Sequence, residues 1–281
     1  MSESRWPAPA KINLFLHILG RDESGYHRLQ TLFQLLDWGD EIRIEPTDES
    51  DLVLLRPTPG VPTDQDLGLR AARLLQDETG VRLGAKISVT KRIPLGAGLG
   101  GGSSDAATVL HALNCLWDAG LSVTDLAALG RRLGADVPVF VHGASAWAEG
   151  RGELLTPMSV GESWYVLGFP GTHVSTAAVF NAPDLPRNSP AIDPSDYAWE
   201  RCRNDCQAWV LDHHPGLEDW LAGLAEFGAP RMSGTGSCFY LRARDSDVAH
   251  EITQALKSRY NVRAVRGVDT SPLLETCAEA R

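Results

Sequence analysis

An α+β fold, with strands and helices mixed along the chain, is predicted for this sequence of 281 residues. Three observations support this class. Short apolar runs that alternate in polarity indicate strands in both halves of the chain. Segments with apolar residues at helical spacing lie between these runs, and several of them stop at a glycine. The two patterns do not follow one another in the regular βα order that a doubly wound parallel sheet requires.

The first half of the chain combines strands with three helices. Strands are expected at 11–19, 40–45, 51–55 and 85–93, helices at 67–79, 106–119 and 124–133, and a hairpin at 144–156. We expect 51–55 to pair with 40–45. Ser103 or Ser104 is expected to cap the helix at 106–119. Gly80, Gly120 and Gly134 would end the three helices, because glycine adopts the left-handed conformation of a helix C-terminus without strain.

The second half begins after a weakly marked boundary near residues 158–161. A long loop is expected at 183–194, helices at 199–213, 217–227 and 248–260, and strands at 238–242 and 262–266. A second glycine-bearing loop, Ser233-Gly234-Thr235-Gly236-Ser237, precedes the strand at 238–242. We therefore predict two domains, residues 1–158 and residues 159–281.

Composition narrows the class of protein. With 26 basic and 36 acidic residues the formal net charge is −10, which disfavours general binding to nucleic acid. The apolar run at 12–19 is interrupted by Asn13 and His17 and is too short to span a bilayer. The five cysteines have no framework spacing, which is typical of a reducing cytoplasm.

One group of residues raises the question of a metal site. Cys202 and Cys206 are four positions apart, with His213 and His214 nearby. No second cysteine pair follows them, so two small residues on one face of a helix are the favoured interpretation.

The densest signal is the run from Pro94 to Asp105, which leads from an expected strand into an expected helix. Its members are Pro94, Leu95, Gly96, Ala97, Gly98, Leu99, Gly100, Gly101, Gly102, Ser103 and Ser104. A glycine-rich turn before a capped helix offers free N–H groups and the positive end of the helix dipole to an anion, so we predict phosphate binding here.

Two other phosphate motifs match this run poorly. Gly96, Gly98 and Gly101 fit the G-x-G-x-x-G spacing of dinucleotide-binding oxidoreductases, but the acidic residue expected after the next strand is missing. A P-loop is also excluded, because no lysine follows the last glycine.

A phosphoryl-transfer enzyme without that lysine still needs positive charge at the γ-phosphate and a group that orients the attacking hydroxyl. Lys11 opens a buried strand, and Asp136 stands in an apolar stretch just before Val137-Pro138. Either residue has an ordinary alternative: Lys11 could extend to solvent from a strand end, and Asp136 could cap a helix. The residues alone do not decide between these interpretations.

Three segments together resemble the motifs of the GHMP kinase superfamily, in the family's order. They are Pro9-Ala10-Lys11-Ile12-Asn13-Leu14, the run Pro94–Ser104, and Ser233–Ser237. Two further segments, Gly25–Phe33 and Gly134–Phe140, are similar to the branch that phosphorylates the 2-hydroxyl of 4-diphosphocytidyl-2-C-methyl-D-erythritol, on the non-mevalonate route to isopentenyl diphosphate. The resemblance covers nearly the whole chain and is weakest at 183–227.

The resemblance implies a two-domain fold and an ATP-dependent kinase. The N-terminal domain would be similar to a ribosomal-protein α/β domain, and the C-terminal domain would be ferredoxin-like. Asp136 would take up or orient the proton of the hydroxyl, and Lys11 would hold Asp136 ionised and stabilise negative charge. The run 94–104 would bind the phosphates of ATP with Mg²⁺, for which no protein ligand is assigned. The implied partner is a small nucleotide-linked sugar alcohol, and the protein would be a monomer or homodimer.

The same resemblance implies contacts to the cytidyl substrate. Tyr26 and His27 would recognise the cytosine, one by stacking and the other by hydrogen bonds. The further contacts implied are Asn13, Thr176, Phe180, Gly234, Thr235 and Gly236. One departure concerns Asp66, where the family usually carries asparagine. A carboxylate accepts but does not donate as an amide does, which puts adenine contacts there in doubt.

Two alternatives remain open at this stage. A different GHMP kinase would act on mevalonate, homoserine or a sugar, but would have no use for Tyr26 and His27. A binding-only protein would use the ribosomal-protein-like domain to hold RNA. The net negative charge and the presence of both Lys11 and Asp136 weigh against this binding-only protein.

Overall fold

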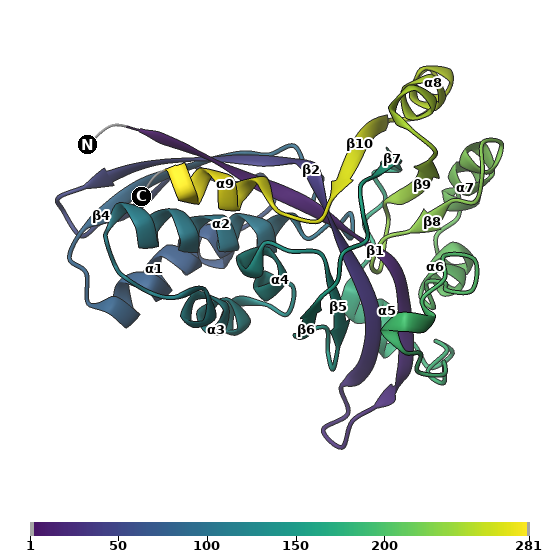
Figure 1. The fold of residues 1–281 in the computed structure, drawn as a ribbon, viewed down its shortest axis with the longest axis horizontal. Coiled ribbons are helices and arrows are strands. Elements are labelled where there is room, and N and C mark those ends of the chain that lie inside the picture. The colour runs from purple at the N-terminus through teal and green to yellow at the C-terminus, as the bar shows by residue number, and fades with distance from the viewer. Residues whose placement is uncertain (1–2, 280–281) are drawn as a thin grey trace.

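A long antiparallel hairpin runs through both halves of the molecule. The structure is a computed structural model, and it describes residues 3–279. Strand β1 (Ser4–Arg21) pairs along its length with β2 (His27–Thr47). Three irregularities in the pairing of β1, between Pro9 and Lys11, Asn13 and Leu16, and Ile18 and Gly20, bend the ribbon. The hairpin therefore contributes to one lobe with its open end and to the other with its tip (Figure 1).

The other strands extend this hairpin into one sheet. Within residues 3–279 the strand order is β3-β4-β2-β10-β7-β9-β8, with β1 and β5 also paired to β2, and β6 to β5. Their bounds are β3 (Leu52–Arg56), β4 (Gly84–Thr90), β5 (Ala146–Glu149), β6 (Leu154–Pro157), β7 (Ser163–Gly168), β8 (Arg231–Met232), β9 (Phe239–Ala243) and β10 (Val262–Val268). Strand β10 joins the two halves, because Gly267 and Val268 pair with Leu36 and Leu35 of β2.

Helices gather in two groups, one in each lobe (Figure 1). The first group comprises α1 (Leu67–Thr79), α2 (Gly101–Leu116), α3 (Val123–Leu133), α4 (Val137–His142) and α9 (Pro272–Glu279). The second comprises α5 (Thr176–Asn181), α6 (Gln207–His213), α7 (Leu217–Ala225) and α8 (Ser246–Leu256), and short 3-10 turns stand at Thr63–Gln65 and Pro194–Asp196. Helix α9, last in the chain, returns to the first lobe.

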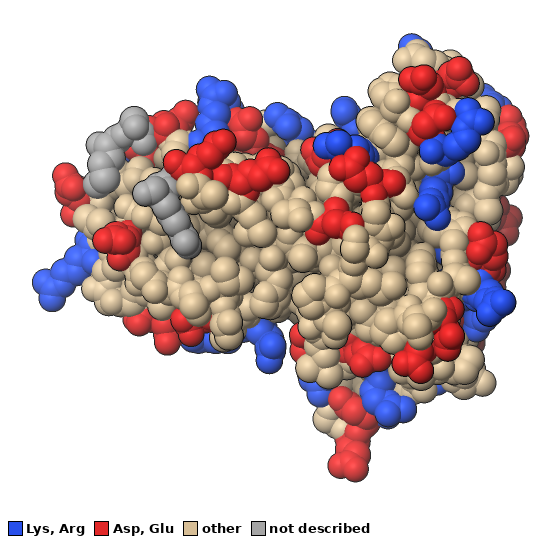
Figure 2. All heavy atoms as spheres, in the orientation of Figure 1, with Lys and Arg blue, Asp and Glu red and all other residues tan. Residues whose placement is uncertain are grey.

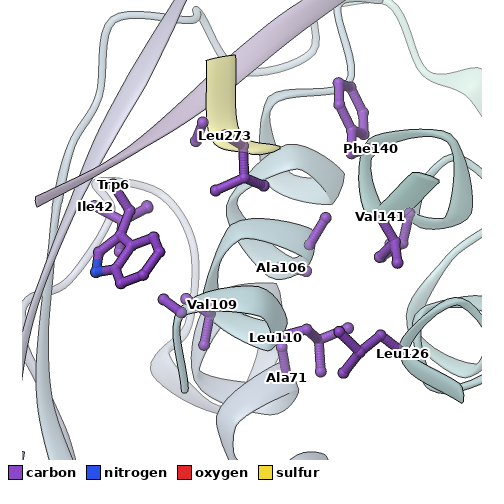
Figure 3. Close-up of a cluster of buried hydrophobic side chains, with 14 of the residues drawn as sticks. Trp6, Ile42, Ala71, Ala106, Val109, Leu110, Leu126, Phe140, Val141 and Leu273 are labelled. Atoms are coloured by element: carbon purple, nitrogen blue, oxygen red, sulfur yellow. The ribbon is translucent and has the colours of Figure 1, made fainter. Parts of the chain in front are cut away.

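The first lobe has a large apolar core around α2. Figure 3 shows Val109 and Leu110 of this helix among side chains from the sheet and the neighbouring helices. Trp6 of β1 closes one side, and Leu273 of α9 closes another. The helix is buried over most of its surface, so its N-terminus is held in a fixed place.

The second lobe has its own core, to which the hairpin also contributes. Leu16 and Ile18 of β1 are buried there with Phe239 and Leu241 of β9 and with residues of α5–α8. A third cluster lies between the lobes and includes the middle of β1 from Ala10 to Phe15. One strand thus contributes to all three clusters.

Several predicted elements differ from the structure. Strand β3 pairs in parallel with β4, which separates it from the 40–45 part of β2, so the predicted pairing of 51–55 with 40–45 is wrong. The strands at 11–19 and 40–45 are parts of the much longer β1 and β2. Helix α6 begins at Gln207 and not at residue 199. Before it, the side chain of Asn204 accepts from Cys206 N and donates to Met232 O of β8 and to Gly234 O.

The start of α2 is also earlier than predicted. Gly100, with φ of 71°, is the N-cap, and Ser103 and Ser104 lie inside the first turn. The predicted cap by a serine is therefore wrong, because a glycine in the left-handed region reverses the chain one turn sooner. The predicted helix bounds at Leu67–Thr79 and the hairpin turning at Gly150–Gly152 are confirmed.

The surface carries both signs of charge. On the face shown in Figure 2, Lys and Arg side chains are interspersed with Asp and Glu around the rim, and uncharged residues fill the centre. None of the helices that the structure describes has the length and the apolar character needed to cross a membrane. The expected lack of nucleic-acid binding stays a prediction.

Candidate active site

The three motifs quoted above meet around one cavity of about 420 Å³ between the lobes. Strand β1 contributes Lys11 and Asn13, the segment after β4 contributes every residue from Pro94 to Ser103, and the turn before α4 contributes Asp136. The second lobe contributes Thr176, Phe180, Gly234 and Thr235. Four predicted site residues, Tyr26, His27, Ser104 and Gly236, do not line this cavity.

Lys11 and Asp136 form an ion pair at the cavity wall. Lys11 Nζ lies 3.2 Å from Asp136 Oδ2 and donates to Asn13 Oδ1 at 2.6 Å. Lys11 is only 3% exposed, so it does not extend to solvent as the alternative required. Asp136 is the N-cap residue of α4, but its side chain makes no capping hydrogen bond. It is directed at Lys11 instead, with 34% of the side chain exposed.

Asn13 and Ser233 tie the first motif to the other two. Ser233 Oγ donates to Gly98 O at 2.8 Å and accepts from Asn13 N at 3.2 Å. Asn13 Nδ2 donates to Thr31 Oγ1 of the neighbouring strand at 2.9 Å. The ammonium of Lys11 adds a longer contact of 3.4 Å to the same Gly98 carbonyl. These bonds fix the glycine run relative to the ion pair.

The glycine run ends at the N-terminus of α2. Ser104 N donates the first helical bond to Gly100 O at 2.9 Å, so the N–H groups of Gly101, Gly102 and Ser103 precede the helical ladder. Gly98 has φ of 72°, and a Cβ atom there would lie 2.2 Å from Ser233 O. Glycine is required by both conformation and space. The result is a loop whose backbone donors and helix dipole suit a polyphosphate.

A buried triad of charged residues holds the segments on both sides of the glycine run. Lys91 Nζ contacts Asp40 Oδ2 at 2.5 Å and Asp105 Oδ2 at 2.8 Å. Asp40 Oδ1 also accepts from Arg92 N and Ile93 N, which holds the chain just before the glycine run. The triad therefore links β2, the segment after β4 and the first turns of α2.

Two carboxylates share one ammonium in this triad, and the pKa values of Asp105 and Lys91 are shifted. Burial raises the pKa of Asp105 to about 7; the Lys91 ammonium opposes this shift and the Asp40 carboxylate adds to it. Burial acts against the charged form of Lys91, yet the carboxylates of Asp105 and Asp40 raise its pKa. The pKa of this buried carboxyl, beside the glycine run, thus lies near neutral pH.

Tyr26 lies on the turn between β1 and β2, and the residue is 59% exposed. The guanidinium of Arg151, on the β5–β6 turn, lies 3.7 Å from its ring centroid. Arg151 also donates to Asp22 at 3.0 Å, and Asp22 accepts from Tyr26 N at 3.0 Å. One face of the Tyr26 ring is therefore covered, and the turn that carries it is tied to the cavity residue Arg151.

His27 lies beside Phe180, a residue of the cavity lining. Their ring centroids are 5.1 Å apart, and Phe180 lines the cavity. Burial lowers the pKa of His27, and the nearby cations Arg187 and Arg21 lower it further, which favours the neutral form of the ring. Two other lining residues, Thr176 and Thr235, share a hydrogen bond of 2.9 Å between their Oγ1 atoms.

Asp66 has a structural role in the described residues. Its Oδ1 accepts from Leu69 N at 3.0 Å, which makes it the N-cap of α1. It also lines a smaller cavity of about 200 Å³ with Thr58, Lys91 and Asp105. The two cavities share Leu67, Lys91, Leu95 and Gly102 in their linings. A contact of Asp66 with adenine stays a prediction.

Some residues of the site were not predicted from the sequence. The main ones are the triad of Asp40, Lys91 and Asp105 and the arginines Arg151 and Arg187. Ser233 belongs to a quoted motif, but its bonds to Gly98 and Asn13 were not predicted. Asp105 and Lys91 flank the glycine run in sequence, which is a usable signal. Arg151 and Arg187 lie in loops without a pattern, and only the fold brings them to Tyr26 and His27.

Comparison with known proteins agrees with this arrangement. The family described as "GHMP kinases N terminal domain" matches residues 66–144, and "GHMP kinases C terminal" matches residues 199–262. A solved structure of homoserine kinase from Cytophaga hutchinsonii has a TM-score of 0.66 at 18% identity, with 96% of each chain covered. At that identity the likeness shows the fold.

More similar proteins indicate a single branch of these kinases. The 4-diphosphocytidyl-2-C-methyl-D-erythritol kinase of Alkalilimnicola ehrlichii is 52% identical over 98% of this chain and 94% of its own. That of Pseudoalteromonas atlantica is 48% identical over 97% of this chain and 96% of its own. A crystal structure of 4-(cytidine 5′-diphospho)-2C-methyl-D-erythritol kinase has a TM-score of 0.83 at 35% identity, covering 94% of this chain and 100% of that one. This chain therefore belongs to the 4-diphosphocytidyl-2-C-methyl-D-erythritol kinase family of the GHMP kinases.

Proposed function

We propose that this protein transfers the γ-phosphoryl group of ATP to the 2-hydroxyl of 4-diphosphocytidyl-2-C-methyl-D-erythritol, as the names of its relatives indicate. The observation that carries the proposal is the pair of Lys11 and Asp136, 3.2 Å apart on the wall of the cavity that the glycine run lines. A hydroxyl between that pair and the end of the run would stand in line with a γ-phosphate.

The chemistry needs little from the protein beyond positioning and charge. A bond forms between the substrate oxygen and the γ-phosphorus while the bond to the β,γ-bridging oxygen breaks, and ADP leaves. Asp136 accepts a hydrogen bond from the attacking hydroxyl and takes its proton as the new bond forms. Lys11, fixed by Asn13 and Asp136, stabilises negative charge on the oxygens.

Magnesium ion is part of the proposal, as a companion of the ATP phosphates. The cavity lining suits a cation that keeps phosphate and water ligands, because Asp136 is its one carboxylate among the described residues and Ser103 adds a hydroxyl. When bound, Mg²⁺ neutralises charge on the phosphates. The backbone N–H groups at the start of α2 would orient the same phosphates.

Phe180, which lines the cavity, would hold the cytosine together with Tyr26 and His27, whose side chains contact the lining residues Arg151 and Phe180. Tyr26 and Phe180 offer ring faces for stacking, and His27 offers a polar edge. Asn13, Thr176, Gly234, Thr235 and Gly236 would contact the sugar alcohol and its diphosphate. We also propose that the chain divides near residue 158 into two domains, with the β1–β2 hairpin and α9 each packing into the core of the other domain, and that it works in the cytoplasm as a monomer or homodimer.

ADP release with a panel of acceptors tests the reaction. With Mg-ATP, we expect release to depend on the cytidyl substrate and to stay at background with mevalonate or homoserine. Carbon 2 of the acceptor carries a methyl group and no hydrogen, so the new phosphomonoester should show no three-bond phosphorus–proton coupling in ³¹P spectra. Turnover of mevalonate instead, or a coupled ³¹P signal, would contradict the proposal.

A further inference from the structure

Arg187 uses its whole guanidinium group to organise the part of the site around His27 and Phe180. It stands in the long loop after α5, and its Nε donates to His27 Nε2 at 2.9 Å. Its Nη1 donates to Leu185 O at 2.8 Å and Pro183 O at 3.3 Å. Its Nη2 donates to Phe180 O at 3.1 Å and also to Ala182 O. All five N–H donors of the side chain thus have acceptors.

The bond to His27 determines where the imidazole proton resides. A neutral imidazole has one N–H nitrogen and one nitrogen with a lone pair. Arg187 Nε and Arg21 Nε both direct hydrogens at His27 Nε2, at 2.9 Å and 3.3 Å. Nε2 therefore supplies the lone pair, and the proton stays on Nδ1. An arginine side chain always carries its protons, so this assignment does not change with pH in the neutral range.

The same guanidinium holds the backbone at Phe180, whose ring lies beside that of His27. It binds the Phe180 carbonyl directly and Ala182 O one residue beyond α5. The ring of Phe180 lies 5.1 Å from that of His27. One side chain consequently fixes both the tautomer of His27 and the spacing between His27 and Phe180.

We propose that Arg187 is a positioning residue that holds His27 as the Nδ1–H tautomer and thereby makes this site select cytosine over uracil. The inference rests on the proposed function. Cytosine offers a lone pair at N3, which an Nδ1–H donor can bind. Uracil carries a hydrogen at N3, which would face that donor and leave both unpaired. The opposite tautomer of His27 would invert the preference.

The tautomer can be measured in the free wild-type enzyme, without substrate. Long-range ¹H–¹⁵N spectra distinguish protonated from unprotonated ring nitrogens, and His27→Gln identifies the signals of His27. We expect a protonated Nδ1 and an unprotonated Nε2. A protonated Nε2 would overturn the inference while leaving the kinase assignment standing.

Base selectivity tests the consequence. At saturating ATP, CDP and UDP are compared as inhibitors against the cytidyl substrate. We expect wild type to prefer CDP by about tenfold or more, the effect of one hydrogen bond lost to an unpaired donor. Arg187→Lys keeps the charge but not the planar fork, and should reduce the preference to below about threefold. The KM for ATP should change by less than about twofold, which also shows that the variant folds.

Arg201→Lys is the matched control, since it makes the same substitution at an exposed position outside the cavity. It should behave as wild type. An Arg187→Lys enzyme that keeps full preference for CDP would overturn the inference. A wild type that turns over the cytidyl substrate but binds CDP and UDP equally would overturn it as well, whereas a wild type that ignores the substrate would overturn the proposed function beneath it.

Discussion

At the scale of single residues, the site depends on charges whose partners come from distant parts of the sequence. Lys11 meets Asp136 across 125 positions, and Lys91 joins Asp40 to Asp105. Buried ions of this kind need their partners, because an unpaired charge in the interior is costly. The residues of each group therefore act together, and substitution of one changes the others.

Asp105 provides a test of this coupling through pH. Its pKa is about 7 in the folded protein and about 4 when the chain is unfolded. The folded state therefore binds more protons between these values, and the free energy of unfolding falls as pH rises from about 4 to about 7. Asp105→Asn removes this contribution. Urea unfolding of both proteins at pH 5, 6, 7 and 8 should give a difference that changes with pH and levels off above about 7. A difference that is constant across the series would contradict the shift.

Tyr26 provides a test of the cytosine subsite. Tyr26→Ala removes the stacking surface over Arg151 and should raise the KM for the cytidyl substrate about tenfold or more, since base stacking on an aromatic ring contributes about 1–3 kcal/mol. The KM for ATP should stay within about twofold. Tyr26→Phe keeps the ring and serves as the control. Equal increases in both Michaelis constants would count against a role in substrate recognition.

At the scale of elements, the glycine run is held by contacts that only glycine permits. Gly98 combines a φ of 72° with the close approach of Ser233 O, whereas Gly80 has a φ of 67° and open space around its Cα. A comparison of the two positions separates the effect of backbone conformation from the effect of packing. Alanine would be strained at both positions, and at position 98 its Cβ would also clash with the loop at Ser233.

We expect Gly98→Ala to reduce both stability and activity. Gly80→Ala should cost about 1 kcal/mol from conformation alone, and Gly98→Ala clearly more, because its Cβ would displace the loop at Ser233. The kcat/KM for ATP should fall at least about tenfold in Gly98→Ala and stay near wild type in Gly80→Ala. Chemical denaturation and steady-state kinetics measure the two effects. Similar behaviour of both variants would mean that the close approach is unimportant.

Local sequence predicted the elements that local chemistry decides. Helix α1 starts at its Asp66 cap and ends before Gly80 as its pattern indicates, and the β5–β6 turn stands at its glycines. The parallel pairing of β3 with β4 depends on which strand enters the sheet between β3 and β2, which no local pattern records. The start of α2 was mistaken because Gly100, not a serine, forms the cap.

The candidate site also divides into residues that local sequence predicts and residues that only the fold brings together. The motif residues were found because phosphate binding imposes glycines and a helix start on one continuous segment. Arg187 and Arg151 were not, because their partners His27 and Tyr26 are more than 120 positions away in sequence. A pattern in one segment carries no information about a side chain that reaches it from another loop.

At the scale of the whole molecule, the β1–β2 hairpin makes the two lobes dependent on one another. Trp6 and Ala8 belong to the first core, and Leu16 and Ile18 on the same strand belong to the second. Helix α9 closes the chain onto the first core through Leu273. The lobes therefore share strands and should not unfold separately.

Leu273→Ala tests this dependence at a fully buried position. We expect a loss of about 2–5 kcal/mol in the free energy of unfolding, the cost of a cavity in a close-packed core. Unfolding followed by far-ultraviolet circular dichroism and by tryptophan fluorescence should give a single coincident transition in both wild type and variant. Two separate transitions, with only the first shifted by the substitution, would show that the lobes unfold independently.

The central claim is that Lys11 and Asp136 form the phosphoryl-transfer centre of a cytidyl-substrate kinase. The measurement that tests it most directly is ADP release by wild type and by Asp136→Asn, with saturating Mg-ATP and 4-diphosphocytidyl-2-C-methyl-D-erythritol. The account predicts substrate-dependent release by wild type and a fall of at least about a hundredfold in kcat for the variant, with the KM for ATP little changed. Release by Asp136→Asn at the wild-type rate would contradict it.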